Sequence, residues 1–263
     1  MTGAVSFAFV LGVLAPLAPA GLPWTLAALG FSVSSADGRA TGLRPSLGRG
    51  VATGTLAGVA FASFLLLAAA LKELGLDLAD GLAIPNLLLS ATLLVLGLGL
   101  AFQASRFATA PSRAVPLLIA LAFAACSMPG VLAILHRLLE RSADQSAGGV
   151  IGATALVIAG AATAFAAISV AGILIGHALA SFGALRRALG AVAVIAGGAI
   201  SVAYWLPDAR GSVDDPGSGL GETLSDVSRS VGDFLAGNVL VPALFFLALA
   251  AMVLLGSART ERA

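Results

Sequence analysis

The chain has 263 residues, of which 59% are hydrophobic and 10% charged, and its mean hydropathy is +1.04. Soluble domains are typically about 45–50% apolar and about 25% charged, so a soluble protein of this composition would have too few charges to cover its surface. The sequence has no cluster of Lys and Arg of the kind that neutralises phosphates, so we expect no nucleic acid as a partner. We therefore expect an all-α integral membrane protein whose main contact is the lipid bilayer.

Several apolar stretches are long enough to cross the hydrocarbon of a bilayer, which takes about 20 helical residues. They cover residues 4–33, 50–71, 85–104, 115–136, 150–176, 187–206 and 237–256. The sequence thus predicts about seven transmembrane helices. We divide the chain into a six-helix core over 1–206, an extracytoplasmic acidic loop over 207–236, and a seventh helix with a short cytoplasmic tail over 237–263. Within the loop, residues 220–235 have the spacing of a short amphipathic helix, although a solvated linker fits equally well.

The gaps between these stretches alternate in charge. Basic residues such as Arg39, Arg106 and Arg186 predominate in one set of gaps, and acidic residues predominate in the other. Because basic loops stay on the cytoplasmic side, we expect the N-terminus outside and the C-terminus inside a bacterial cytoplasmic membrane. Residues 18–20 resemble a signal-peptide cleavage site, but no basic segment precedes them, so we expect the first stretch to be retained.

The first stretch is too long for one straight crossing, since about 30 helical residues extend about 45 Å. Its middle holds Pro16, Pro19, Gly21 and Pro23, and prolines remove amide donors and clash with the preceding turn. The fourth stretch has a similar interruption at Cys126-Ser127-Met128-Pro129. Paired interruptions in corresponding spans are typical of an inverted repeat with its site near the midplane. We therefore predict an inverted three-plus-three repeat with broken helices 1 and 4, plus one extra C-terminal span.

The second stretch contains a small-residue ridge at Gly50, Gly54 and Gly58. Glycines spaced by four residues let two helix backbones approach closely inside a membrane. We interpret this ridge as a helix-packing surface, although sliding of helices during alternating access would use the same residues.

Two short motifs carry a resemblance to a known family. They are Pro19-Ala20-Gly21-Leu22-Pro23 in the first stretch and Ala125-Cys126-Ser127-Met128-Pro129 in the fourth. The chain resembles the CcdA/DsbD family of transmembrane thiol-disulfide electron carriers, whose members carry a Pro-Cys-x-x-Pro motif in each of these spans. The resemblance covers residues 4–206, and it makes the chain a divergent member in which Ala20 stands at the position of the first-span cysteine.

The resemblance implies a redox carrier rather than a conventional enzyme, with no cofactor. In the family, two cysteines take electrons from cytoplasmic thioredoxin and pass them to extracytoplasmic thioredoxin-like proteins, for cytochrome c maturation or disulfide repair. The corresponding redox thiol here is Cys126, the single cysteine of the chain. Because disulfide exchange needs a second thiol to resolve the mixed disulfide, either a partner supplies it or the relay has been lost. A buried structural cysteine is the other interpretation of Cys126.

Other functions remain open on the same scaffold. A small-solute or metal-ion transporter could line its path with the uncharged polar residues of the spans, and a non-catalytic membrane scaffold would need no such path. The polar residues are Thr25, Asn86, Ser127 and Thr163.

The remaining candidate side chains indicate no metal site. His136 and His177 fall at opposite ends of the fourth and fifth stretches, so we expect them on opposite sides of the membrane and no shared metal. Tyr204 and Trp205 stand where an interfacial aromatic anchor is expected.

Overall fold

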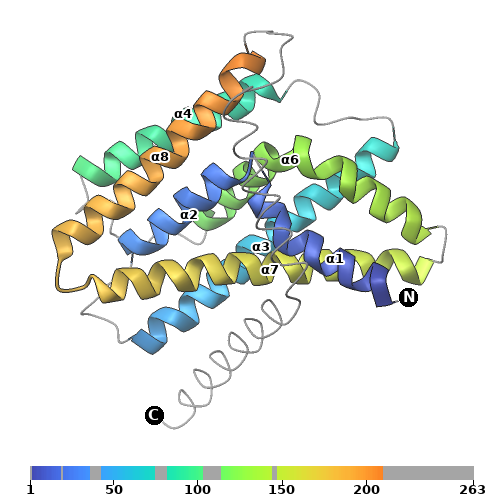
Figure 1. The fold of residues 1–263 in the computed structure, drawn as a ribbon, viewed down its shortest axis with the longest axis horizontal. Helices are drawn as coiled ribbons and strands as arrows, with labels where there is room; N and C mark the ends of the chain where they lie inside the picture. The colour runs from blue at the N-terminus through green and yellow to red at the C-terminus, as the bar shows by residue number, and fades with distance from the viewer. Residues whose placement is uncertain are drawn as a thin grey trace.

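The computed structural model describes residues 2–18, 20–35, 43–74, 82–102, 114–143 and 147–209. Every element in these residues is a helix, as Figure 1 shows. The helices are α1 (Thr2–Leu14), the 3-10 helix η1 (Ala15–Leu17), α2 (Leu22–Ser35), α3 (Leu43–Glu73), α4 (Ala83–Phe102), α6 (Ala114–Ala143), α7 (Ala147–Ala178) and α8 (Gly183–Ala209). The predicted all-α class is confirmed for this part of the chain.

Four of the described helices are long and apolar enough to cross a membrane. They cover Leu43–Lys72, Ala83–Phe102, Gly148–Ala178 and Gly183–Leu206, and the bent pair formed by α1–η1 and α2 would make a fifth. In α6 the apolar segment is shorter, at Ile119–Met128. These helices support a membrane protein, while most of the predicted acidic loop and the predicted seventh helix, residues 210–263, lie outside the described residues.

The predicted interruption of the first stretch is present between Leu17 and Leu22. The helical segments on its two sides are bent by 76°, and Figure 1 shows α1 and α2 extending to opposite sides of the centre. The break leaves the Pro16 carbonyl without its helical donor, and the Thr25 hydroxyl donates to it at 2.8 Å. A side chain thus replaces the hydrogen bond that the helix loses.

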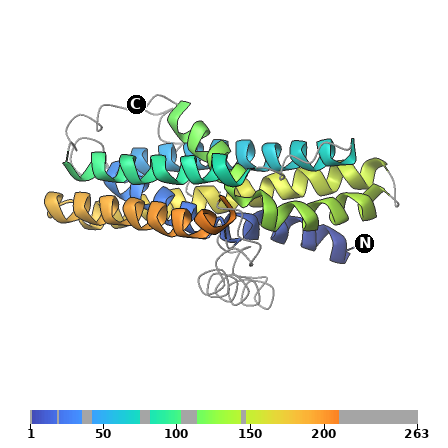
Figure 2. The same cartoon turned by 90° about the horizontal axis from the view of Figure 1, so that it is seen from above.

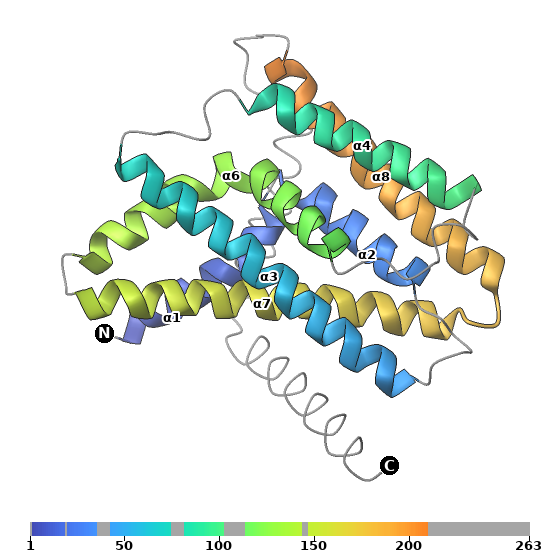
Figure 3. The same ribbon diagram turned by 180° about the vertical axis from the view of Figure 1, so that it is seen from behind.

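The predicted break in the fourth stretch is wrong. α6 continues as one α-helix through Cys126 and Pro129, and Figure 3 shows it bent rather than interrupted. A single proline removes only one amide donor, which kinks a helix without ending it. The Ser127 hydroxyl also bonds back to the Phe123 carbonyl at 2.9 Å, a contact that favours bending.

The helices form a flat slab when seen from above in Figure 2. α3 packs along α7, and α4 packs along α8. α2 lies against both α8 and α7, whereas α1 packs on α7 and α6 packs on α3. α4 has little contact with α6. The 3-10 helix η1 contacts α1, α2, α6 and α7, so the break in the first stretch lies where several helices converge.

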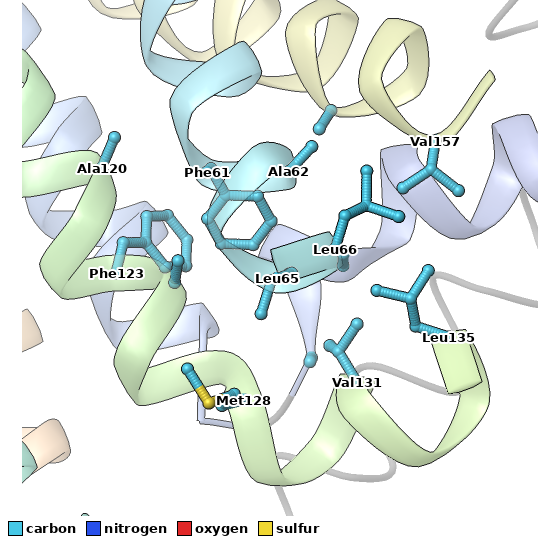
Figure 4. Close-up of a cluster of buried hydrophobic side chains, with 14 of the residues drawn as sticks. Phe61, Ala62, Leu65, Leu66, Ala120, Phe123, Met128, Val131, Leu135 and Val157 are labelled. Atoms are coloured by element: carbon cyan, nitrogen blue, oxygen red, sulfur yellow. The ribbon is translucent and has the colours of Figure 1, made fainter. Parts of the chain in front are cut away.

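Aromatic side chains fill this convergence. Phe61 of α3, Phe123 of α6 and Phe165 of α7 pack with ring centroids 5.1–5.2 Å apart. The ring centroid of Trp24 of α2 lies 6.3 Å from that of Phe123. Figure 4 shows Phe61 of α3 and Phe123 of α6 facing each other, with aliphatic side chains of the same two helices beside them. Such rings bury large apolar areas and hold α6 firmly against its neighbours.

The glycine ridge of α3 lies against α7. A Cβ added at Gly58 would lie 2.5 Å from the Ala161 carbonyl oxygen, and one added at Gly54 would lie 2.6 Å from the Phe165 carbonyl oxygen. Gly50 faces the side chain of Ile173. The obstacles at Gly54 and Gly58 are backbone atoms, so these two positions allow the close approach of the two helices.

We predict that Gly58→Ala lowers the free energy of unfolding in detergent by about 1–3 kcal/mol, and with it the melting temperature, because the added methyl group would collide with the backbone of α7. The matched control is Gly152→Ala on α7, where an added Cβ meets nothing within 4 Å. That variant should be neutral or slightly stabilised, since alanine is the better helix former. Equal melting temperatures for the two variants would contradict the packing interpretation.

Candidate functional site

Cys126 lies on the inner face of α6 and is 0% exposed. It belongs to the main apolar core, and the side chains of Trp24 on α2 and Ser90 on α4 lie within hydrogen-bonding reach of its sulfur. The thiol is therefore enclosed by three helices. A partner protein or reagent reaches this sulfur only if the helices around it move apart.

The break in the first stretch meets the Cys126 segment directly. A Cβ added at Gly21 would lie 2.9 Å from Ser127 Oγ and 3.0 Å from a ring carbon of Phe123. Only a residue without a side chain fits this close approach. Ala20, the next residue back along the chain, is also buried. The structure thus brings the two motif segments together.

The other motif residues have different surroundings. Met128 is buried in the cluster shown in Figure 4. Pro23 is buried at the start of α2, where its carbonyl closely approaches Gly197 of α8. Pro129 lies within α6, and Pro19 lies outside the described residues.

A chain of polar contacts runs from α6 through α4 to α8. Asn86 Nδ2 donates to the Ala125 carbonyl at 3.4 Å, and the Ser90 hydroxyl donates to the Asn86 carbonyl at 2.7 Å. Ser90 Oγ and Ser201 Oγ are 2.6 Å apart. Since the single hydroxyl proton of Ser90 goes to Asn86, Ser201 is the donor in that pair. The sequence singled out Asn86 but missed both serines, although Ser90 shares a helix face with Asn86 four residues away.

Buried polar atoms without a hydrogen-bond partner among the described residues include Asn86 Oδ1 and Trp205 Nε1. The predicted role of Trp205 as an interfacial anchor needs correction, because its side chain is buried in the helix packing rather than at the surface. Unpaired polar atoms are costly in an apolar interior. The Asn86 Oδ1 atom is therefore an acceptor available to a small hydrogen-bonding molecule.

The remaining polar candidates do not join this site. Thr25 bonds the Pro16 carbonyl, and Thr163 bonds the Ala159 carbonyl of its own helix at 2.8 Å. His136 pairs with Glu140 at 3.3 Å, and His177 lies in the last turn of α7. Within the described ranges, no three His, Cys, Asp or Glu side chains come together as a possible metal site.

We predict that Cys126 in the folded protein resists a small membrane-permeant maleimide and reacts fully after denaturation, because its sulfur is enclosed. Ser181→Cys in a Cys126→Ser background is the matched control, since Ser181 is exposed in the turn between α7 and α8. The control should label at least about 100-fold faster, the ratio expected if labelling of Cys126 waits for an opening of a few kcal/mol. Equal labelling rates would show that the thiol is open to the surroundings.

Comparison with known proteins found no matching family model, no matching curated protein and no matching solved structure.

Proposed function

We propose that this protein uses a CcdA/DsbD-like scaffold to support transmembrane thiol-disulfide electron transfer, or the maturation of a cytochrome c or secreted enzyme, with Cys126 as its redox thiol. The observation that carries the proposal is the contact between Gly21 and Ser127. It sets the motif around Ala20 beside the motif around Cys126. Two such motifs must meet if they are to carry a disulfide, because bonded cysteines have Cα atoms about 4.4–6.8 Å apart.

The helix pairing supports an inverted repeat in the proposed six-span core. If α1–α2, α3 and α4 form one half and α6, α7 and α8 the other, then the extensive pairs α3–α7 and α4–α8 join equivalent spans. The α1–α7 pair is then equivalent to α6–α3, and both are close. The α2–α8 pair has a much weaker counterpart in α4–α6. The two halves are thus proposed to be related but unequal.

The proposal includes the finer topology and partners. The N-terminus lies outside and the C-terminus inside a bacterial cytoplasmic membrane, with thioredoxin on the inner side and a thioredoxin-like protein on the outer side. The alternation of basic and acidic gaps supports this orientation.

Thiol-disulfide exchange through the single Cys126 conserves atoms and electrons if the partner proteins supply the other sulfur atoms. The Cys126 thiolate attacks the disulfide of an oxidised partner, which forms a mixed disulfide and frees one partner thiolate. A thiol of a reduced dithiol partner then attacks the Cys126 sulfur and displaces the first partner, now a dithiol. The second thiol of the reduced partner releases Cys126 and leaves that partner as a disulfide. Two electrons and two protons thus pass between partners.

A restored cysteine pair tests the scaffold. We predict that Ala20→Cys forms a disulfide with Cys126 under mild oxidation, seen as loss of maleimide labelling in the denatured protein and its recovery after reduction. Ala27→Cys is the matched control, because Ala27 is equally buried on α2 but faces Gly197 of α8. If both thiols of the Ala20→Cys variant stay free, the correspondence with the family fails.

Cys126→Ser separates the redox proposal from a second candidate, a carrier of small uncharged solutes. The unpartnered acceptor Asn86 Oδ1 favours that candidate, because it offers a neutral hydrogen bond in the interior of the helix bundle. If the thiol is redox-active, a thioredoxin variant with a single active-site cysteine should be trapped by the native protein and not by Cys126→Ser. Full activity of Cys126→Ser, together with thermal stabilisation by a solute, would favour the carrier.

A further inference from the structure

α6 lacks one backbone hydrogen bond beside the thiol. In an α-helix each amide donates to the carbonyl four residues earlier, and proline has no amide hydrogen. Pro129 lies within α6, so the carbonyl left without its helical donor is that of Ala125. This is the residue immediately before Cys126. A buried carbonyl in a membrane protein needs a donor from elsewhere.

Asn86 supplies that donor from another helix. Its Nδ2 lies 3.4 Å from the Ala125 carbonyl oxygen, and the side chain is 0% exposed. Since a carbonyl accepts only from a donor, the contact fixes Nδ2 toward α6. The other end of the amide, Oδ1, has no partner among the described residues. A buried asparagine with an unsatisfied acceptor costs free energy. Its presence here therefore indicates that the fold needs its donor.

The contact also joins two parts of the slab that otherwise touch little. α4 packs along α8, and the hydroxyl pair of Ser90 and Ser201 strengthens that pairing close to Asn86. Between α4 and α6 the packing is sparse. The Asn86–Ala125 bond is therefore a polar tie between the α4–α8 pair and the bent helix that carries Cys126.

We propose that Asn86 is a positioning residue for Cys126. It replaces the donor that Pro129 withholds, holds the bend of α6, and keeps Ser90 beside the thiol. A shift of α4 away from α6 breaks the tie and opens the enclosure around Cys126. The assignment rests on the proposed function for its purpose, which is to control when the thiol meets a partner sulfur.

A double-mutant cycle tests the tie. The proteins are the wild type, Asn86→Leu, Pro129→Ala and the double variant, and the measurement is the maleimide labelling rate of Cys126 in the folded protein. We expect Asn86→Leu to raise the rate by about tenfold or more in the wild-type background, because the Ala125 carbonyl is then left unsatisfied. Alanine at position 129 restores the helical donor, so adding Asn86→Leu there should change the rate by less than about twofold.

Two controls separate this role from general packing. Asn86→Gln keeps the amide donor and should label more slowly than Asn86→Leu. Thr92→Val on the exposed face of α4 should leave the rate unchanged, since the Thr92 hydroxyl bonds only the Leu88 carbonyl of its own helix.

The proposal is overturned if Asn86→Leu raises the labelling rate of Cys126 equally in both backgrounds. It is also overturned if Asn86→Leu fails to fold in both backgrounds. Failure to assemble in the wild-type background alone, with rescue by Pro129→Ala, supports it. The cycle measures helix opening and not electron transfer. A failed thioredoxin trap together with a coupled cycle would therefore reject the redox function and leave the tie in place.

Discussion

The fold depends on one constraint, which is that backbone polar groups inside an apolar helix bundle must find partners within the protein. Two prolines show how this chain meets it. Near Pro16 the helix is interrupted, and the Thr25 hydroxyl bonds the freed carbonyl from the next half-helix. At Pro129 the helix continues, and the amide of Asn86 reaches across from α4 to the carbonyl of Ala125. The first repair is local in sequence, whereas the second ties two distant helices together.

Close helix packing then brings these two substitute hydrogen bonds into one region. The glycine ridge of α3 allows its backbone to lie against that of α7, and Gly21 allows the break to lie against α6. The aromatic rings of Phe61, Phe123 and Phe165 fill the space between the three helices. Cys126 is enclosed because the break, the bend and the aromatic cluster all converge on it.

The sequence predicted the elements better than their contacts. Apolar windows located most helices to within a few residues, because hydropathy and helix length are local properties. The break before Leu22 was predictable because several prolines and a glycine coincide there. The continuity of α6 was not, since a proline ends some helices and only bends others, and the local sequence around Pro129 does not distinguish the two. The pair Ser90–Ser201 joins residues 111 positions apart, and no local pattern reports such a contact. Trp205 was misplaced for the same reason, because its burial depends on tertiary packing.

The enclosure of the thiol has an optical consequence. The chain has two tryptophans, and one of them, Trp24, lies beside Cys126. A thiol in contact with an indole quenches its fluorescence by accepting an electron from the excited ring. Emission from Trp24 is therefore dimmed while the helices stay closed and brightens when the sulfur moves away. Trp205, at the far end of α8, provides a reference within the same molecule. The fluorescence of the native chain thus reports whether α2 and α6 stay together around Cys126.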